Sequence, residues 1–365
     1  MIYNIKYKMT LNKGAIMRAI MKNKPEKGFE LCEVEEPVLT SSDDIKVKLI
    51  QSSICGTDYH IYKWDQWSQN NVTLPHINGH EGLAKVVEVG ANVTNVKVGD
   101  TIAFETHFYC GHCYMCTTGD AHVCENMKIL GVHTNGIWAD YAVIPANIAF
   151  KIDPRVDLKY AGIMEPLGNA VHTINYSNVL GKHVLVSGAG PIGIMAAEVA
   201  SKAGAASVTV LEINDFRKEM LSKVNCHIVD PIKENALDRI KEITDGRLID
   251  VVLEMTGNGD AFNNCIDYVH PCADMNILSV YPSSKIDIRM NDIVFKNIRL
   301  QGVTGRRIFD TWHIVNGLLA NNVLNKEVLD AVLTHTVNLE DFEEAFKIIE
   351  AGQAGKITIK INELE

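Results

Sequence analysis

The sequence has few of the features that mark fibrous, disordered or nucleic-acid-binding chains. Of its 365 residues only 10 are proline, 22% are charged, and no stretch is compositionally biased. These values exclude collagen, coiled coil and intrinsic disorder. Positive charge is also scarce, with 35 basic against 45 acidic residues and a formal net charge of -10. Because an acidic chain repels a phosphate backbone, we expect no nucleic acid among its partners.

Long apolar runs of the kind that cross membranes are missing as well. The longest weakly polar stretch, residues 183–200, contains charged and helix-breaking residues, so we predict no membrane span and no membrane partner. Residues 1–16 carry three lysines but no apolar core or cleavage site, and so do not resemble a signal peptide. We therefore expect a cytoplasmic protein whose nine cysteines stay reduced, with residues 1–16 as an N-terminal extension.

The length of the chain predicts two domains, and the hydrophobic patterns divide it into two unlike halves. From about Met17 to Asn147, short stretches alternate between apolar and polar residues, which predicts an all-β, loop-rich half. The clearest of these stretches are residues 44–50, 83–89 and 101–105.

From about Ile163 the pattern changes to apolar runs separated by helical periodicity. This rhythm predicts βαβ units and an α/β half built on a parallel sheet. Beyond about Phe309 we expect two amphipathic helices, near residues 312–319 and 342–349, and a final strand over 356–361 that returns to the first domain. The expected strands of the parallel sheet are residues 183–187, 208–211, 251–255, 275–280 and 298–303.

A glycine-rich loop follows the apolar strand at 184–186 and begins a helix, which is the context of a dinucleotide site. Two leading glycines let the backbone turn tightly against a pyrophosphate, the third allows close helix-strand packing, and the helix N-terminus offers amide donors. The alternative is a tight turn that merely needs glycines. The loop residues are Gly188, Ala189, Gly190, Pro191, Ile192 and Gly193.

Glu212 ends the next predicted strand, where a carboxylate would accept hydrogen bonds from the adenosine ribose hydroxyls. Its charge would repel a 2'-phosphate and Ile213 offers no compensating cation, so NAD is favoured over NADP. The alternative for Glu212 is a solvated strand end. Arg217 lies five residues further on and could reach the adenine or a phosphate, or simply be a charge on a helix surface.

Four cysteines lie within fifteen residues in the spacing C-x2-C-x2-C-x7-C. A single loop can arrange four such thiolates as a tetrahedron around zinc, and a site without room for water is structural rather than catalytic. The spacing therefore predicts a structural zinc site rather than disulfides. The four cysteines are Cys110, Cys113, Cys116 and Cys124.

A second set of metal-ligating residue types is dispersed along the chain, and composition alone does not connect its members. Taken singly, each of these residues could equally be an ordinary surface or core residue. The set consists of Cys55, His80, Glu81 and Glu165.

With these motifs, the chain resembles the zinc-dependent medium-chain alcohol dehydrogenases from about Met17 onward. The resemblance implies a GroES-like β-rich catalytic domain over residues 1–162 and 309–365 and a Rossmann coenzyme domain over residues 163–308. It also implies two zinc ions per chain, one catalytic and one structural, with NAD as the hydride acceptor. A homotetramer is expected on the same ground.

The resemblance assigns roles residue by residue. The catalytic zinc ligands fall on Cys55, His80 and Glu165, with Glu81 as a neighbouring carboxylate able to bind zinc or exchange with water or substrate. A proton would leave through Thr57, the nicotinamide ribose and His60. Two further residues receive roles, each with an alternative from the sequence alone. His107 would lie beside the substrate or satisfy a loop carbonyl, and Arg306 would contact the coenzyme or be a surface charge.

Within the family, four segments are most similar to the branch that oxidises L-threonine at C3 to 2-amino-3-oxobutyrate. For this substrate, Glu81 and Glu165 would bring negative charge toward the ammonium group. Three departures, Ala84, Ala273 and Ser279, stand where glycines are usual and could shift the nicotinamide end of the coenzyme. The matching segments are residues 60–69, 105–107, 165–172 and 302–306.

Two alternatives stay open at this point. One is a polyol or secondary-alcohol dehydrogenase of the same family, acting on a substrate such as sorbitol or 2,3-butanediol. The other is a catalytically idle, zinc-stabilised nucleotide-binding protein. The joint presence of the implied zinc ligands and proton-relay residues argues against the idle protein, since such a chain has little reason to keep them all.

Overall fold

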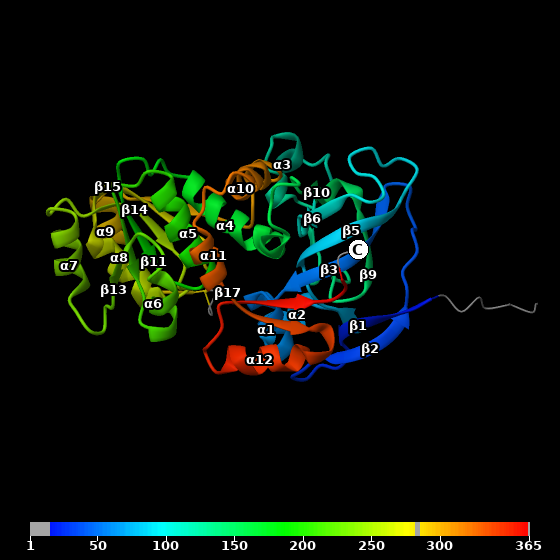
Figure 1. Cartoon of the computed structure of the whole chain (residues 1–365). Coiled ribbons are helices and arrows are strands. Elements are labelled where there is room, and N and C mark those ends of the chain that lie inside the picture. The colour runs from blue at the N-terminus through cyan, green and yellow to red at the C-terminus, as the bar shows by residue number, and fades with distance from the viewer. Residues whose placement is uncertain (1–14, 282–284, 364–365) are drawn as a thin grey trace, which may run out of the picture.

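The computed structural model describes residues 15–281 and 285–363. Its strands form two large sheets that lie in two adjacent parts of the molecule (Figure 1). One part is rich in β-structure and the other alternates strands with helices, as the sequence predicts. Residues 1–14, most of the predicted N-terminal extension, lie outside the described residues.

The β-rich part is built on a seven-stranded sheet of order β10-β6-β5-β3-β18-β17, in which β9 also pairs with β3. A three-stranded sheet of order β2-β1-β4 and the pair β7-β8 complete it. The strands of this part are β1 (Ile16–Lys22), β2 (Glu30–Glu35), β3 (Asp44–Ser53), β4 (His76–Ile77), β5 (Glu81–Val89), β6 (Thr101–Phe104), β7 (His107–Phe108), β8 (Lys128–Ile129), β9 (Tyr141–Pro145), β10 (Ala149–Lys151), β17 (Leu333–Asn338) and β18 (Lys356–Lys360).

The expectation of an all-β first half is wrong, because helices interrupt it. The first begins at Cys55, where Asp58 accepts a hydrogen bond from the Cys55 backbone in a capping box. The second begins at Asp65, whose side chain accepts from the backbone of Ser68. The helical segments here are α1 (Gly56–Lys63), α2 (Gln66–Asn71), α3 (Tyr114–Thr117) and the short 3-10 turns η1 (Ala121–Val123), η2 (Ala146–Ile148), η3 (Leu158–Ile163) and η4 (Leu339–Asp341).

The second sheet has six parallel strands in the order β13-β12-β11-β14-β15-β16. The strand order reverses between β11 and β14, which is where dinucleotides bind in doubly wound folds. The fifth strand begins six residues before the predicted one, because polar residues conceal its start in the sequence. The strands are β11 (His183–Ser187), β12 (Ser207–Leu211), β13 (His227–Val229), β14 (Ile249–Glu254), β15 (Val269–Ile277) and β16 (Arg299–Gly302).

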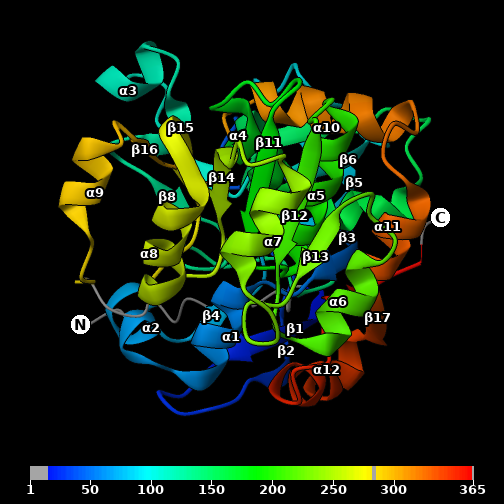
Figure 2. The same ribbon diagram turned by 90° about the vertical axis from the view of Figure 1, so that its left-hand side faces the viewer.

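Helices cover both faces of this parallel sheet. One face packs against α4, α5, α10 and α11, and the other packs against α7, α8 and α9. Figure 2 shows α8 and α9 on one side of the strands and α5, α6 and α11 toward the other. The helices are α4 (Met164–Asn175), α5 (Pro191–Lys202), α6 (Asp215–Leu221), α7 (Ala236–Ile243), α8 (Gly259–Tyr268), α9 (Met290–Phe295), α10 (Asp310–Ala320), α11 (Lys326–Val332) and α12 (Phe342–Glu350).

The C-terminal segment returns to the β-rich sheet. β18 pairs antiparallel with β3 and parallel with β17, and α12 lies beneath that sheet near α1 (Figure 1). One hydrophobic cluster joins the two parts, with Leu83 and Phe150 from the β-rich sheet packed among Leu167 of α4 and Trp312 of α10. Among the described residues, no helix has both the length and the apolar character needed to cross a bilayer. The exact domain limits stay a prediction.

Candidate functional site

Three of the dispersed residues meet where β3 and β5 lie side by side. Cys55 is the N-cap of α1, His80 immediately precedes β5, and Glu81 is the first residue of β5. Their ligand atoms all lie within 4.8 Å of one another. We call Cys55, His80 and Glu81 the open cluster.

The strand register explains how residues far apart in sequence come together here. Ser53, the last residue of β3, is paired with Glu81, so Cys55 emerges beside the start of β5. Gly79 is needed just before His80, because it has a φ of +90° and a Cβ there would lie 2.1 Å from the Trp138 ring. The backbone is thereby directed toward Cys55.

Asp58 lies behind the open cluster and is fully buried. Its Oδ2 accepts from the Cys55 backbone at 2.8 Å, and its Oδ1 lies 3.5 Å from Nδ1 of His80. Neither that Oδ1 nor that Nδ1 has a hydrogen-bond partner within the described chain. Burial lowers the pKa of His80, but Asp58 and Cys55 together more than offset this and raise it well above its usual value. A carboxylate behind an imidazole is the usual outer shell of a metal-binding histidine, so the residues present fit a metal ion.

Glu81 has a buried cationic partner that the sequence reasoning missed. Nζ of Lys356, at the start of β18, donates to Oε1 of Glu81 at 2.6 Å and lies 2.5 Å from its Oε2. The hydroxyl of Ser53 donates to the same carboxylate. Nothing in the sequence identifies Lys356 as buried, because it stands in a strand where isoleucines alternate with polar residues.

Glu165, in the first turn of α4, is not a member of the open cluster as the described residues define it. It is buried and forms an ion pair with Arg306, and Asn169 donates to its Oε2 at 3.5 Å. Burial raises the pKa of Glu165, against the opposing charge of Arg306. Because Glu81 and Glu165 each have a cationic partner, the negative charge that they would bring toward an ammonium group is partly offset, and that role stays a prediction.

Arg306 is fully buried, so the alternative of a surface charge is wrong. It bridges the two parts of the molecule by pairing with Glu165 of α4 and with Glu105, which follows β6. Glu105 also accepts from the Trp312 indole at 2.7 Å. Although burial raises the pKa of Glu105, Arg306 and His107 hold it well below its usual range. The predicted contact between Arg306 and the coenzyme stays a prediction.

His107 contacts a carboxylate rather than the loop carbonyl that the alternative interpretation required. Its Nδ1 lies 2.6 Å from Oε1 of Glu105 and 3.0 Å from Nη2 of Arg306. A Cβ on Gly305 would lie 2.5 Å from the His107 ring, so glycine is needed there. Glu105 fixes the orientation of the His107 ring through Nδ1.

The two relay residues lie one turn apart on α1. The Thr57 hydroxyl is 3.9 Å from the Cys55 sulfur, and His60 follows three residues later on the same helix face. The His60 side chain is 52% exposed, and its Nδ1 lies 2.5 Å from Oδ2 of Asp65. One residue therefore adjoins the open cluster and the other adjoins solvent.

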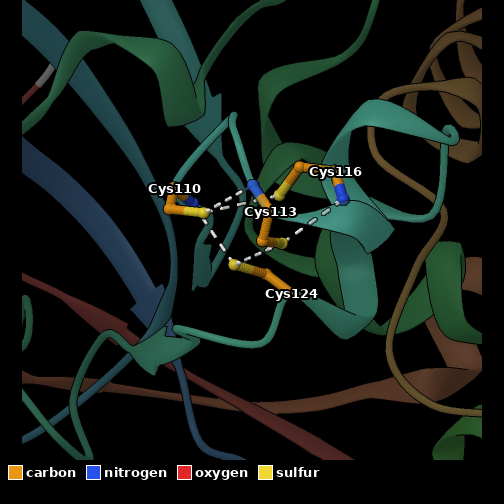
Figure 3. A group of neighbouring side chains, drawn as sticks. All are labelled: Cys110, Cys113, Cys116 and Cys124. Carbon is orange, nitrogen blue, oxygen red and sulfur yellow. Dashed lines mark hydrogen bonds between the residues drawn. The ribbon is translucent and has the colours of Figure 1, made fainter.

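The four cysteines of the predicted structural site form a compact group, which we call the cysteine loop (Figure 3). The sulfur atoms of Cys113 and Cys124 are 3.8 Å apart and those of Cys110 and Cys116 are 4.0 Å apart. A tetrahedron with Zn–S bonds near 2.3 Å has edges of about 3.8 Å. The separations between the sulfur atoms therefore match those of a tetrahedral zinc site.

Hydrogen bonds from the same loop support the sulfurs. The backbone amides of Cys113 and Cys116 point to the sulfurs of Cys110 and Cys113, at 3.4 and 3.5 Å. The backbone amide at His112 and the Asn126 side chain lower the pKa of Cys110 to about 5. Metal ions bind the deprotonated thiolate form of cysteine, so the lowered pKa favours metal binding at Cys110.

The glycine-rich loop joins β11 to α5 as predicted. Gly188 has a φ of +95°, and a Cβ on Gly193 would lie 2.1 Å from the Gly188 carbonyl oxygen, so both positions require glycine. Gly190 is the N-cap of α5, supplies no capping side chain, and has open space where a Cβ would stand. With Pro191 and Ile192 in its first turn, α5 leaves its N-terminal amides available to a phosphate, which fits a dinucleotide.

Glu212 is buried, so the alternative of a solvated strand end is wrong. Its carboxylate accepts from the backbone of Ala189 at 2.9 Å and from Ile213 and Asn214 at 2.8 Å each. Arg217 lies 3.7 Å from the same carboxylate, with 40% of its side chain exposed. Glu212 therefore stabilises the glycine-rich loop.

The three departures from the family pattern have ordinary surroundings. Ala84 and Ala273 are buried in the core. Ser279 donates to the buried carboxylate of Glu254, which also accepts from the Tyr281 hydroxyl at 2.7 Å. These contacts fasten the segment after β15 to the end of β14, beside the point where the strand order reverses.

Comparisons with known proteins agree with this geometry. A family model described as "Alcohol dehydrogenase GroES-like domain" matches residues 41–154, and one described as "Zinc-binding dehydrogenase" matches residues 191–321. The L-threonine 3-dehydrogenase of Pyrococcus abyssi is 42% identical over 94% of this chain and 99% of its own length.

Solved structures show the same architecture. The 2R,3R-butanediol dehydrogenase of Bacillus subtilis has a TM-score of 0.85 and 28% identity, covering 95% of this chain and 100% of that one. A protein described as a short chain alcohol dehydrogenase from E. coli CFT073, complexed with the cofactor NADH, has a TM-score of 0.84 and 25% identity at the same coverage.

The predicted fold class, a GroES-like β-rich domain with a Rossmann coenzyme domain, is therefore confirmed. Because both family models describe dehydrogenases, the alternative of an idle binding protein is wrong. On the strength of a relative 42% identical over nearly the whole length of both chains, this chain belongs to the family of zinc-dependent alcohol dehydrogenases.

Proposed function

We propose that the chain oxidises L-threonine at C3 to 2-amino-3-oxobutyrate, with NAD as hydride acceptor. The observation that carries this proposal is the 42% identity with an L-threonine 3-dehydrogenase across 99% of that relative. The butanediol dehydrogenase, a candidate for the polyol or secondary-alcohol alternative, is only 28% identical. The open cluster supplies the chemistry that such a reaction needs.

The open cluster would hold the catalytic zinc through Cys55, His80 and a carboxylate, either Glu81 or Glu165. Bound there, zinc would supply the Lewis-acid charge that lowers the pKa of a substrate hydroxyl. The cysteine loop would hold a second, structural zinc, giving two zinc ions per chain.

The chain itself has to carry the hydroxyl proton out of a buried site. Thr57, whose hydroxyl is close to the Cys55 sulfur, would accept the proton from the substrate side. His60 would take it at the exposed end of the relay, where Asp65 fixes the orientation of the ring through Nδ1. The nicotinamide ribose hydroxyl would lie between these two residues.

The coenzyme would lie along the carboxyl ends of β11, β12 and β14. Its pyrophosphate would meet the α5 amides above Gly188 to Gly193, and its adenosine ribose would meet Glu212. Because the Glu212 carboxylate also fastens the loop, it both shapes the pyrophosphate site and disfavours a 2'-phosphate, with Arg217 at its edge. Arg306 would contact the coenzyme.

Threonine carries a carboxylate and an ammonium beside its hydroxyl, and a buried pocket must satisfy both charges. His107, oriented by Glu105, is the imidazole we propose beside the substrate. The segment from Trp64 to Trp67 would close the cleft over α1. A pocket built for both charges rejects neutral alcohols, because they leave its polar groups unpaired.

We further propose a homotetramer in the cytoplasm. β16 forms the edge of the parallel sheet, and Leu300 on it and Phe295 on α9 are exposed apolar side chains. An open strand edge with apolar neighbours is a surface that an oligomer can cover. Light scattering that gives a monomer would exclude this part of the proposal.

A panel of alcohols, assayed for NADH formation at saturating NAD, tests the function. We expect kcat/KM for L-threonine to exceed that for sorbitol or 2,3-butanediol by at least about a hundredfold, or roughly 2.7 kcal/mol of transition-state binding. Comparable or higher values for the polyols would favour the alternative dehydrogenase.

A further inference from the structure

Lys356 is a buried lysine that the proposed reaction does not use. Only 4% of the residue is exposed, although it opens the last strand of the sheet. Its Nζ donates to the Ile54 carbonyl at 2.9 Å and to Oε1 of Glu81 at 2.6 Å, and lies 2.5 Å from Oε2. A lysine is almost never buried unless it is paired, so its position next to this carboxylate requires an explanation.

Both partners of Lys356 are joined directly to metal-ligand residues. Ile54 precedes Cys55 in the chain, and Glu81 follows His80 and belongs to the open cluster itself. The ammonium group therefore lies at the edge of the open cluster.

A cation in this position opposes a metal ion in two ways. It repels a divalent ion, because charges in a buried site are poorly screened. It also binds both oxygens of Glu81, the atoms that a metal would need. The hydroxyl of Ser53 donates to the same carboxylate and holds it in the same direction.

We propose that Lys356 is a positioning residue that competes with the catalytic zinc for Glu81 and so keeps that zinc weakly held and one coordination position open. This inference rests on the proposed function, because it requires zinc at the open cluster. An open position is what separates a catalytic zinc site from a closed structural one. With Lys356 removed, a buried Glu81 without its cation becomes a strong additional ligand.

The test is the release of zinc from the purified full-length protein to a chelator, dipicolinate, followed by metal analysis. In Lys356→Met we expect the faster-released zinc to leave at least about tenfold more slowly, the scale on which second-shell partners change metal affinity. The d–d absorption of cobalt exchanged into the open cluster should change as Glu81 joins the coordination. The zinc of the cysteine loop should be unaffected in this variant.

Matched variants separate this effect from a change in folding. Lys360→Met removes an exposed lysine of the same strand, paired with Glu363, and should release zinc as the unchanged protein does. Lys356→Arg keeps the charge and should do the same. Glu81→Gln in the Lys356→Met background should abolish the slowing, since the freed ligand is then missing.

A third variant tests the inference even when Lys356→Met does not fold. Glu81→Gln alone should change zinc release by less than about threefold, because Lys356 already occupies that carboxylate in the unchanged protein. A large loss of zinc in this variant would overturn the inference. Two zinc ions per chain with unchanged or faster release in Lys356→Met would overturn it as well, while leaving the proposed function intact. A single zinc in the unchanged protein would instead refute the proposed catalytic site.

Discussion

In the cysteine loop every sulfur is supported by groups of the same short segment, whereas the open cluster depends on residues from distant parts of the chain. Cys110 and Cys124 are 14 residues apart. The backbone amide of Cys110 donates to the Cys124 sulfur, and the Asn126 side chain donates to the Cys110 sulfur. Cys55 is the N-cap of α1 and Glu81 begins β5, and Lys356 follows Ile54 by 302 residues. The supporting groups also differ in charge, since amides surround the sulfurs while Asp58 and Lys356 flank the open cluster.

This difference in how the ligands are supplied gives the two clusters different chemical capacities. A loop that supplies all four ligands leaves no position for substrate. A cluster assembled between strands can leave a position open, because no single segment fixes all of its ligands. We therefore expect the cysteine loop to govern stability and the open cluster to govern turnover.

Replacing Cys55 by serine should give the largest effect on activity. The open cluster would lose its only thiolate, and we expect kcat to fall by more than about a hundredfold, the upper limit for second-shell changes at metal sites. Zinc analysis should show one ion lost and one kept per chain. Cys32→Ser, a change in a strand away from both clusters, is the control, and loss of both zinc ions in Cys55→Ser would contradict the separation.

Replacing Cys113 by serine should lower stability rather than activity. Loss of a structural metal belongs to the few changes that cost more than about 4 kcal/mol of the free energy of unfolding. Denaturant unfolding should show this loss, while the folded fraction keeps zinc at the open cluster and the KM for substrate. An unchanged unfolding midpoint would mean that the cysteine loop does not bear on stability.

Glu212→Ala tests whether the coenzyme half acts independently of both clusters. Loss of hydrogen bonds to a carboxylate should weaken NADH binding by about 1 to 3 kcal/mol and narrow the preference over NADPH. Zinc content should stay at two per chain. Glu219→Ala, an exposed position on α6, serves as the control, and equal kcat/KM for NAD and NADP in the unchanged protein would refute the role of Glu212.

His107→Ala should have the smallest effect of the four. His107 lies between the two clusters, after Glu105 and just before the cysteine loop, so it reports whether they communicate. We expect the preference for threonine over polyols to shrink by about tenfold, or roughly 1.4 kcal/mol, with NAD affinity unchanged. His227→Ala, exposed on β13, is the control. A change in zinc content would show that the two clusters are not independent.

The sequence predicted the features that a single continuous segment of the chain determines. The cysteine loop and the glycine-rich loop that begins α5 follow from local spacing, because their geometry is set by neighbours in the chain. The helices near residues 312–319 and 342–349 follow from their periodicity for the same reason. The helix after Cys55 was missed, because its signal is a single capping box rather than a long periodic pattern.

The parts that the sequence could not predict are contacts between buried charges. Asp58, Lys356 and Glu105 are buried beside groups from other elements, and a sequence does not show which element will lie beside another. The family resemblance suggested which ligands belong together. It did not suggest that Glu81 and Glu165 each carry a cationic partner.

The pairing of β18 with β3 has a consequence for how the protein is made. Lys356 follows Glu81 by 275 residues, so a ribosome that adds about 5–20 residues per second needs roughly 14–55 s to supply it after Glu81 has been synthesised. During this interval β3 has an open edge, and the thiol of Cys55 lies beside a sheet that still lacks β18. The cysteine loop is complete long before. The nascent chain can therefore acquire its structural metal early, while the open cluster is finished only when β18 is added.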